Sequence, residues 1–174
     1  MKNGDNGFTF VLGGARSGKS EFALKKAESF PGPRVYLATA EAKDAEMDER
    51  IKKHKEGRRH DWVTIEEPVD VIKIIEGAKE GVILIDCLTL WITNLMVAGA
   101  ADGEISSASE RLAAACRDSA ARVVAVSNEV GMGIVPEGQL ARRFRDVAGF
   151  ANQRMAENAS DVWFVAAGIP LKMK

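Results

Sequence analysis

One stretch of eight residues constrains the fold of this chain more than any other. Residues 13–20 read Gly-Gly-Ala-Arg-Ser-Gly-Lys-Ser, which fits the phosphate-binding loop (P-loop) pattern G-x-x-x-x-G-K-[S/T]. A short apolar run at residues 8–12 precedes the loop, and residues 21–27 have the pattern of a helix. A chance turn rich in glycine and serine seldom has a strand before it and a helix after it. The sequence therefore predicts a loop that binds a nucleoside triphosphate.

The residue types of this loop suit phosphate. The glycines allow the backbone to curl, so that successive N–H groups point at phosphate oxygens, and the following helix directs the positive end of its dipole at the same anion. We expect Lys19 to bridge the β- and γ-phosphates and the Ser20 hydroxyl to ligate Mg²⁺. The predicted nucleotide-binding residues here are Gly13, Gly14, Ala15, Arg16, Ser17, Gly18, Lys19 and Ser20.

A second metal candidate ends an apolar run at residues 81–86, Gly-Val-Ile-Leu-Ile-Asp. Such a run is typical of a buried central strand that delivers a carboxylate beside Mg²⁺ and the phosphates. Asp86 is therefore the second expected ligand of the metal. An aspartate at this position can instead cap the helix that follows, and one residue can have both roles.

Two further predicted strands end in residues that could contact the nucleotide. Residues 34–40 end in Ala38, Thr39 and Ala40, and residues 62–67 end in two glutamates. Ligands of open α/β sheets bind beyond the carboxyl ends of the strands, so we expect the first of these ends near the nucleotide. A plain strand-to-helix turn there is the alternative.

Residues 43–55 have the pattern of a helix, with acidic residues four positions before basic ones. Met47, Ile51 and His54 fall on one face of this helix. His54 therefore points where the apolar residues point, toward protein or a cleft. A histidine in such a place is more often a packing residue than a catalyst, so the pattern alone leaves both roles open.

The second half of the chain contains two predicted loops. Residues 98–107 are small and polar, and we expect a mobile insertion there before a helix at residues 109–119. Residues 128–136 follow a predicted strand, are rich in glycine and carry one acid, Glu129. Such a loop is either functional or a structural Ω-loop.

The predicted helix at residues 139–158 has an apolar stripe and a basic outer face. The stripe consists of Leu140, Phe144, Val147, Ala151 and Met155, and the outer face carries Arg142, Arg143, Arg145 and Arg154. An arginine cluster can hold phosphate, but pairing of Arg142 with Asp146 on a solvated face is the more common arrangement.

The composition fits one globular domain. The chain has 174 residues, 46% of them hydrophobic, and a formal net charge of -1, and this length can bury a substantial core. The near-neutral charge and the lack of a basic, aromatic-rich stripe argue against a nucleic-acid partner. The two cysteines form neither a metal-binding spacing nor a disulfide framework. Residues 1–7 lack the apolar core of a signal peptide, and no apolar run could span a bilayer, so we expect a cytoplasmic protein.

Strands and helices alternate along the chain, which predicts an α/β fold with a mostly parallel central sheet flanked by helices. We expect residues 8–174 to form a single RecA-like P-loop NTPase domain and residues 1–7 to be a flexible extension. Residues 171–174 are expected to return as a short antiparallel edge strand.

Several stretches together make the chain similar to one known family. They are the P-loop, residues 36–40, 46–58, 62–66, 86–89 and 93–95, the segment Ser-Asn-Glu-Val-Gly-Met-Gly-Ile-Val-Pro at residues 127–136, and residues 140–142 and 144–146. With them the chain resembles the bifunctional adenosylcobinamide kinase/adenosylcobinamide-phosphate guanylyltransferase family of cobalamin biosynthesis. The resemblance runs from about residue 10 to the C-terminus, and the segment at residues 127–136 is its most specific part.

The resemblance implies two reactions. ATP or GTP gives its γ-phosphoryl group to the aminopropanol hydroxyl of adenosylcobinamide, and GTP then gives GMP to the new phosphate with release of pyrophosphate. In the family the GMP passes through a covalent histidine intermediate, and His54 is the matching residue. A neutral imidazole is a competent nucleophile at pH 7. The family's GTP contacts carry over to Gly13 through Ser20 and to Ala38, Thr39, Ala40, Lys55, Glu56, Gly57, Arg58, Glu66 and Asp86.

The sequence departs from the family pattern at two positions. Asp86 stands where the family varies between glutamate and aspartate. Lys53 stands where some relatives have a second histidine, and this leaves His54 as the candidate nucleophile. The family assembles as trimers, which would give the apolar helix predicted at residues 88–97 a place at an interface.

Two other functions fit parts of the sequence. A RecA-like module could bind or hydrolyse a nucleotide and act through assembly, and a small-molecule kinase could use the same loop without nucleotidyl transfer. Retention of His54 with Lys55 and Arg58 argues against loss of nucleotidyl transfer. The corrinoid could lie at either predicted loop, residues 98–107 or 128–136.

Overall fold

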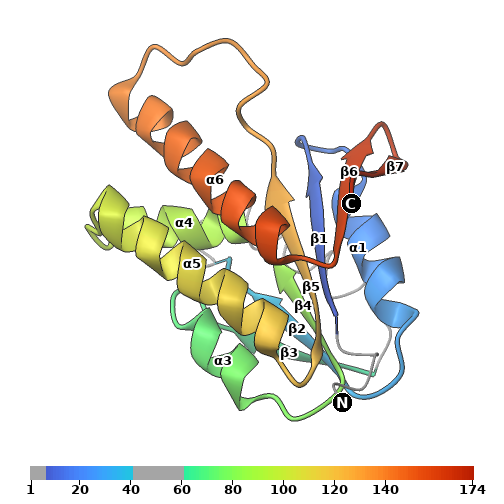
Figure 1. Ribbon diagram of the computed structural model, residues 1–174. Helices are drawn as coiled ribbons and strands as arrows, with labels where there is room; N and C mark the ends of the chain where they lie inside the picture. Colours follow the sequence, from blue (N-terminus) through green and yellow to red (C-terminus); the bar gives the residue numbers. More distant parts are fainter. Residues whose placement is uncertain (1–6, 41–60) are drawn as a thin grey trace.

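The computed structural model describes residues 7–40 and 61–174. Its centre is a seven-stranded sheet in the order β3-β2-β4-β5-β1-β6-β7 (Figure 1). The strands are β1 (Phe8–Gly13), β2 (Arg34–Ala38), β3 (Trp62–Glu66), β4 (Val82–Asp86), β5 (Arg122–Asn128), β6 (Asp161–Ala166) and β7 (Ile169–Lys172). The helix predicted at residues 43–55 lies outside the described residues, and so do the predicted site residues His54, Lys55, Glu56, Gly57 and Arg58.

The strand directions confirm the predicted fold class. β6 and β7 pair antiparallel, and the five other strand pairs are parallel. The sheet is therefore mostly parallel, with an antiparallel edge at the C-terminus. Because parallel strands end at one edge of a sheet, the residues that follow β1, β2, β4 and β5 gather there.

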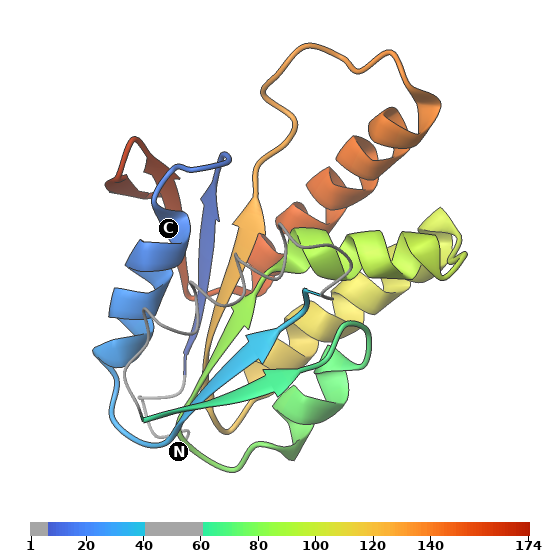
Figure 2. The ribbon, with the colours of Figure 1, turned by 180° about the vertical axis from the view of Figure 1, so that it is seen from behind.

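Helices cover both faces of this sheet. α1 (Lys19–Glu28) lies on one face, whereas α3 (Val71–Gly77), α5 (Asp102–Asp118) and α6 (Gln139–Asn158) lie on the other (Figures 1 and 2). α4 (Leu88–Val97) follows the carboxyl end of β4. Along β4, Ile83 and Ile85 pack into the core beneath α3, α5 and α6, while Leu84 packs toward α1. Burial on both faces explains why this strand is a continuous apolar run.

The prediction of a loop at residues 98–107 is wrong from Asp102 onward, because α5 begins at Asp102 and not at residue 109. Ile105, Ala108 and Leu112 are buried at the i, i+3, i+7 spacing of one helix face. The Glu104 carboxylate accepts a hydrogen bond of 2.8 Å from the Ala101 N–H, as in the reciprocal half of a capping box. Polar residues in the first turn therefore start the helix here instead of forming a loop.

The N-terminal end of α6 and the loop before it extend beyond the rest of the domain (Figure 1). Val147, Ala151 and Met155 of the predicted stripe are buried, whereas Leu140 is 68% exposed. The stripe thus packs on the sheet from its middle onward. Among the helices in the described part of the chain, none is long and apolar enough to cross a membrane.

Candidate active site

The predicted P-loop follows β1 and leads into α1. The Ser17 N–H donates to the Gly14 carbonyl at 3.3 Å, and the Phe22 N–H donates to the Gly18 carbonyl at 3.0 Å. Lys19 is 9% exposed, and its Nζ donates to the Gly14 carbonyl at 3.1 Å. The ammonium therefore lies over the loop, where a bound phosphate would meet it.

The surroundings of Gly13 require glycine, whereas those of Gly14 leave open space. A Cβ on Gly13 would lie 2.5 Å from both Ser17 Oγ and the Val165 carbonyl oxygen, so no larger residue fits there. No described atom lies within 4 Å of the position that a Cβ on Gly14 would take.

The Ser17 hydroxyl is buried and has no hydrogen-bond partner among the described residues. A buried polar atom without a partner is rare, and a phosphate oxygen is an acceptor that this hydroxyl could use.

Asp86, the predicted acid at the end of β4, lies at the same end of the sheet as the loop. One strand, β5, separates β4 from β1, so the two strands are about 10 Å apart. The Tyr36 hydroxyl donates a hydrogen bond to Oδ2 of Asp86. α1 packs against both β4 and β5, and its first turn carries Ser20. Ser20 and Asp86 therefore lie on neighbouring elements, and their predicted role as Mg²⁺ ligands stays a prediction.

Thr39 connects the ends of β2 and β4. Its side chain is buried, and its hydroxyl donates to the Cys87 carbonyl at 2.7 Å and accepts the Cys87 N–H at 2.9 Å. Its carbonyl accepts a hydrogen bond of 2.8 Å from Asn94 Nδ2. Ala38 is buried beside it and Ala40 is half-buried. The Thr39 hydroxyl thus positions the residue after Asp86, and the predicted nucleotide contact at this strand end stays a prediction.

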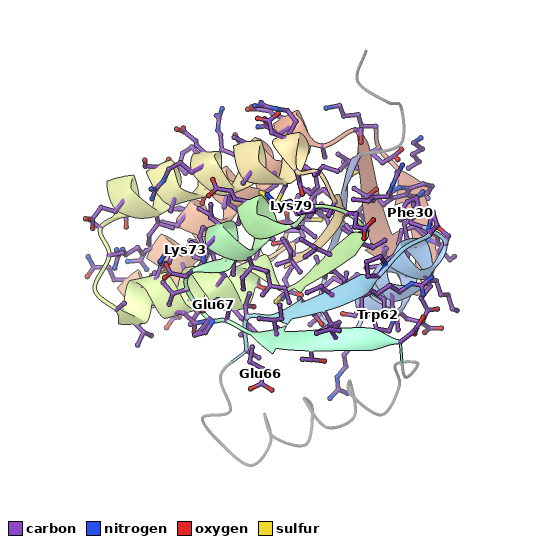
Figure 3. The ribbon with its side chains drawn as sticks, turned by 90° about the horizontal axis from the view of Figure 1, so that it is seen from below. Phe30, Trp62, Glu66, Glu67, Lys73 and Lys79 are labelled. Atoms are coloured by element: carbon purple, nitrogen blue, oxygen red, sulfur yellow. The ribbon has the colours of Figure 1, made fainter. Side chains whose placement is uncertain are left out.

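Glu66 lies farther from the loop than the other described candidates. The strand register places Glu66, Ala38 and Asp86 in one row across β3, β2 and β4. β3 is the edge strand, four strands from β1, which corresponds to about 19 Å. Figure 3 shows Glu66 on the opposite side of β3 from Lys73 of α3. A nucleotide that contacts both the loop and Glu66 must therefore lie along the carboxyl edge of the sheet.

The structure has a hydrogen-bonded group of side chains at the end of β5 that the sequence did not predict. Asn128 is in register with Gly13, and its Nδ2 donates to Thr89 Oγ1 at 2.8 Å. Thr89 Oγ1 lies 3.0 Å from Cys87 Sγ, and Asn152 Nδ2 donates to the Asn128 carbonyl at 3.3 Å. This group joins the end of β5 to the start of α4. The position of Asn128 at the end of a central strand was the signal that could have found it.

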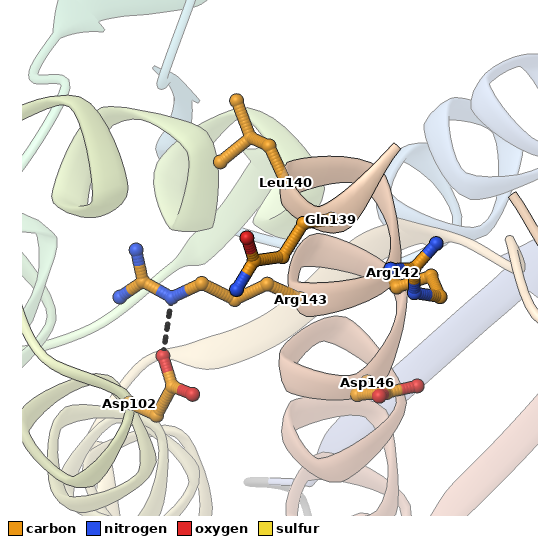
Figure 4. Close-up of a pocket in the computed structure, with 6 residues that line it drawn as sticks. All are labelled: Asp102, Gln139, Leu140, Arg142, Arg143 and Asp146. Atoms are coloured by element: carbon orange, nitrogen blue, oxygen red, sulfur yellow. Dashed lines mark hydrogen bonds and ion pairs between the residues drawn. The ribbon is translucent and has the colours of Figure 1, made fainter. Parts of the chain in front are cut away.

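A separate cavity of about 530 Å³ opens between the starts of α5 and α6, on the face of the sheet opposite α1. Its lining residues are Asp102, Gln139, Leu140, Arg142, Arg143 and Asp146 (Figure 4). Arg143 Nε donates to Asp102 at 2.5 Å. The predicted pairing of Arg142 with Asp146 is wrong, because Arg145 pairs with Asp146 at 2.8 Å and Arg142 donates to two backbone carbonyls. The arginines here stabilise the start of α6.

Comparisons with known proteins show the family of this chain. Residues 9–173 match the model of the family described as cobinamide kinase / cobinamide phosphate guanyltransferase. The chain belongs to this family. The bifunctional adenosylcobalamin biosynthesis protein CobU of Salmonella typhimurium is 44% identical over 181 residues, which cover 94% of this chain and 98% of that protein. The corresponding protein CobP of Pseudomonas aeruginosa is 41% identical over 169 residues, covering 94% of this chain and 95% of its own.

Solved structures share the fold of this family member at low identity. A protein of Pyrococcus horikoshii OT3 superposes with a TM-score of 0.58 at 10% identity, covering 97% of this chain and 86% of that chain. An ATPase from a bacterial type III secretion system superposes with a TM-score of 0.57 at 10% identity, covering 95% of this chain and 56% of that chain. At such identity the likeness shows the fold alone, which is the P-loop NTPase fold that the sequence predicted.

Proposed function

We propose that this family member transfers the γ-phosphoryl group of ATP or GTP to the aminopropanol hydroxyl of adenosylcobinamide, and then GMP from GTP to the resulting phosphate. The products of the second reaction are adenosylcobinamide-GDP and pyrophosphate. The observation that carries the proposal is the P-loop between β1 and α1, with Asp86 two strands away at the same edge of the sheet. A triphosphate and its metal need this pair of features.

In the first reaction the hydroxyl oxygen attacks the γ-phosphorus. The bond from that phosphorus to the bridging oxygen breaks, and the nucleoside diphosphate leaves. Lys19 and the N–H groups of the loop hold the β- and γ-phosphates and stabilise the negative charge of the transition state. The buried Ser17 hydroxyl and the open side of Gly14 fit a phosphate in this position.

Ser20 and Asp86 are the proposed ligands of Mg²⁺. They offer a hydroxyl and a carboxylate, and Mg²⁺ prefers oxygen ligands and usually binds through one or two carboxylates, water and substrate phosphates. When bound, the ion neutralises charge on the phosphates. The Tyr36 hydroxyl orients Asp86 through its hydrogen bond, as partners behind a metal ligand commonly do.

For the second reaction we propose His54 as the nucleophile. Its neutral imidazole attacks the α-phosphorus of GTP, the bond to the pyrophosphate oxygen breaks, and a guanylyl-histidine forms. An oxygen of adenosylcobinamide phosphate then attacks the same phosphorus and releases the imidazole. The further proposed GTP contacts are Ala38, Thr39, Ala40, Lys55, Glu56, Gly57, Arg58 and Glu66.

The covalent intermediate can be tested without the corrinoid. The chain is incubated with Mg²⁺ and GTP labelled at the α-phosphate, then denatured and tested for bound label that is acid-labile and base-stable. We expect label on the wild type and none on His54→Ala, which should keep part of its kinase activity. Equal loss of both activities in His54→Ala would contradict the role of His54.

Two outcomes would favour other functions. In the labelling experiment, tight GTP binding without label would indicate a kinase that lacks nucleotidyl transfer. In a second assay with adenosylcobinamide present, hydrolysis of the nucleotide without transfer to the corrinoid would indicate a RecA-like assembly module. Lys19→Ala should lower both proposed activities by about 100-fold or more, and unimpaired triphosphate binding by this variant would contradict the P-loop assignment.

We also propose that the protein is a homotrimer in the cytoplasm. Val97, at the end of α4, is 70% exposed, and Ile134, in the loop before α6, is 98% exposed. Large apolar side chains this exposed are available for contact with another subunit. Light scattering of the purified chain tests the assembly, and a mass equal to one chain would contradict it.

A further inference from the structure

Phosphoryl transfer to a hydroxyl is accelerated by a group that accepts the hydroxyl proton. Among the described residues, the carboxylates that end or directly follow a strand at the carboxyl edge are Glu66, Glu67, Asp86 and Glu129. Glu66 and Glu67 belong to the end of β3, four strands from the P-loop strand. Asp86 accepts a hydrogen bond from Tyr36 and is the proposed metal ligand. Glu129 follows the strand next to the P-loop strand and is not a proposed metal ligand.

Glu129 lies between the two parts of the nucleotide site. It directly follows β5, the strand between β1, which leads into the P-loop, and β4, which ends in Asp86. The Glu129 N–H donates to the carbonyl of Gly13, the first residue of the loop, at 3.0 Å. The backbone of Glu129 is therefore fixed to the start of the loop that would hold the γ-phosphate.

The carboxylate of Glu129 is oriented by its own loop. The Gly131 N–H donates to Glu129 Oε1 at 2.5 Å, and a Cβ on Gly131 would lie 2.9 Å from that oxygen. Within the described part of the chain, this is the hydrogen bond that the carboxylate accepts, so Oε2 stays open to a substrate donor. The side chain is half-buried, which leaves it within reach of a ligand at the edge of the sheet.

We propose that Glu129 is the general base of the kinase reaction, an assignment that rests on the proposed function. Oε2 accepts the proton of the acceptor hydroxyl while the hydroxyl oxygen forms its bond to the γ-phosphorus. The bond to the bridging oxygen breaks, and its electron pair leaves with the nucleoside diphosphate. Glu129 then releases the proton to water. Transfer of GMP to a phosphate oxygen involves no hydroxyl proton, so the second reaction does not need Glu129.

The test is Glu129→Gln, with the two reactions measured separately. The amide oxygen of glutamine can still accept the Gly131 N–H, so the loop keeps its hydrogen bond while the base is lost. We expect the kcat for phosphorylation of adenosylcobinamide to fall by about 100-fold or more. Guanylyl transfer to adenosylcobinamide phosphate supplied in the assay should stay near the wild-type rate. Glu137→Gln, an exposed glutamate in the same loop, is the control and should leave both rates unchanged.

Chemical rescue gives a second readout. Sodium formate should restore part of the kinase activity of Glu129→Ala, whereas sodium chloride at the same concentration should not. Kinase activity retained by Glu129→Gln, or parallel loss of both reactions, would overturn the assignment and leave Glu129 with a structural role in its loop. A wild-type chain that transfers GMP but lacks kinase activity would instead overturn the first half of the proposed function, and with it the need for a base.

Discussion

The Gly168 N–H donates a hydrogen bond of 2.8 Å to the carbonyl oxygen of Ser17. Gly168 lies in the turn between β6 and β7. The last hairpin of the chain therefore supports the P-loop, which lies near the N-terminus. The contact is close, because a Cβ on Gly18 would lie 3.1 Å from Gly168 Cα. The β6–β7 hairpin therefore forms the antiparallel edge of the sheet, and its turn also fixes the position of the P-loop.

Alanine should destabilise the protein more at Gly18 than at Gly168. The two residues have φ angles of 92° and 79°, so each alanine costs about 1 kcal/mol or more in backbone strain. At Gly18 the new Cβ also meets Gly168 Cα, whereas no described atom lies within 4 Å of a Cβ on Gly168. We expect the free energy of unfolding to fall by about 2–3 kcal/mol for Gly18→Ala and by about 1 kcal/mol for Gly168→Ala. Urea denaturation measures both, and equal losses would contradict the close contact.

Tyr36→Phe should weaken the use of Mg²⁺ without unfolding the protein. The variant removes the hydroxyl that donates to Asp86 Oδ2 and keeps the ring that packs edge-on against Trp62. Loss of one such hydrogen bond costs about 1 kcal/mol, and a less restrained carboxylate binds the metal more weakly. We expect the Mg²⁺ concentration for half-maximal activity to rise by about tenfold. An unchanged Mg²⁺ dependence would argue that Asp86 is not a ligand.

The sequence was most informative where local rules apply. The P-loop needs glycine at Gly13 and a cation at Lys19, and a strand buried on both faces must be apolar, so both stretches were predicted at nearly their true boundaries. The bonds from Gly168 to Ser17 and from Asn128 to Thr89 were not predicted. They join residues far apart in the chain, and which residues meet depends on the strand order that the fold adopts.

The start of α5 was missed for a different reason. Asp102, Gly103 and two serines have low helix propensity, so the segment was interpreted as a loop. The buried Ile105 starts a helical spacing of apolar residues that continues to Leu112. This helical periodicity was a stronger signal than the low helix propensity. Tertiary burial outweighed intrinsic propensity here.

Glu104→Ala should measure how much the cap stabilises α5. Its carboxylate accepts the Ala101 N–H at 2.8 Å and lies at the positive end of the helix dipole. We expect the free energy of unfolding to fall by about 1 kcal/mol. Glu110→Ala, an exposed glutamate farther along the same helix, is the matched control and should change it little. An equal effect of the two substitutions would show that the cap contributes nothing specific.

Cys116 should make the stability of the protein fall at high pH. Burial raises the pKa of its thiol far above the ordinary value of 9.0, because the thiolate is unfavourable in an apolar core. Above pH 9 the unfolded chain loses this proton while the folded chain keeps it, so the unfolded state binds fewer protons. The free energy of unfolding then falls with pH, by up to about 1.4 kcal/mol per unit from this group. Below pH 8 the thiol is protonated in both states and contributes no slope.

Comparison with Cys116→Ala isolates this contribution, because the other titrating groups are the same in both proteins. At pH 7.5 we expect the alanine variant to be less stable by about 1 kcal/mol, since a buried sulfur is lost from the core. Between pH 9 and 10.5 the wild type should lose stability faster than the variant, so the difference should shrink and then reverse. Urea unfolding at each pH measures it, and a difference that stays constant would show that the thiol remains protonated in the unfolded chain or ionises in the folded one.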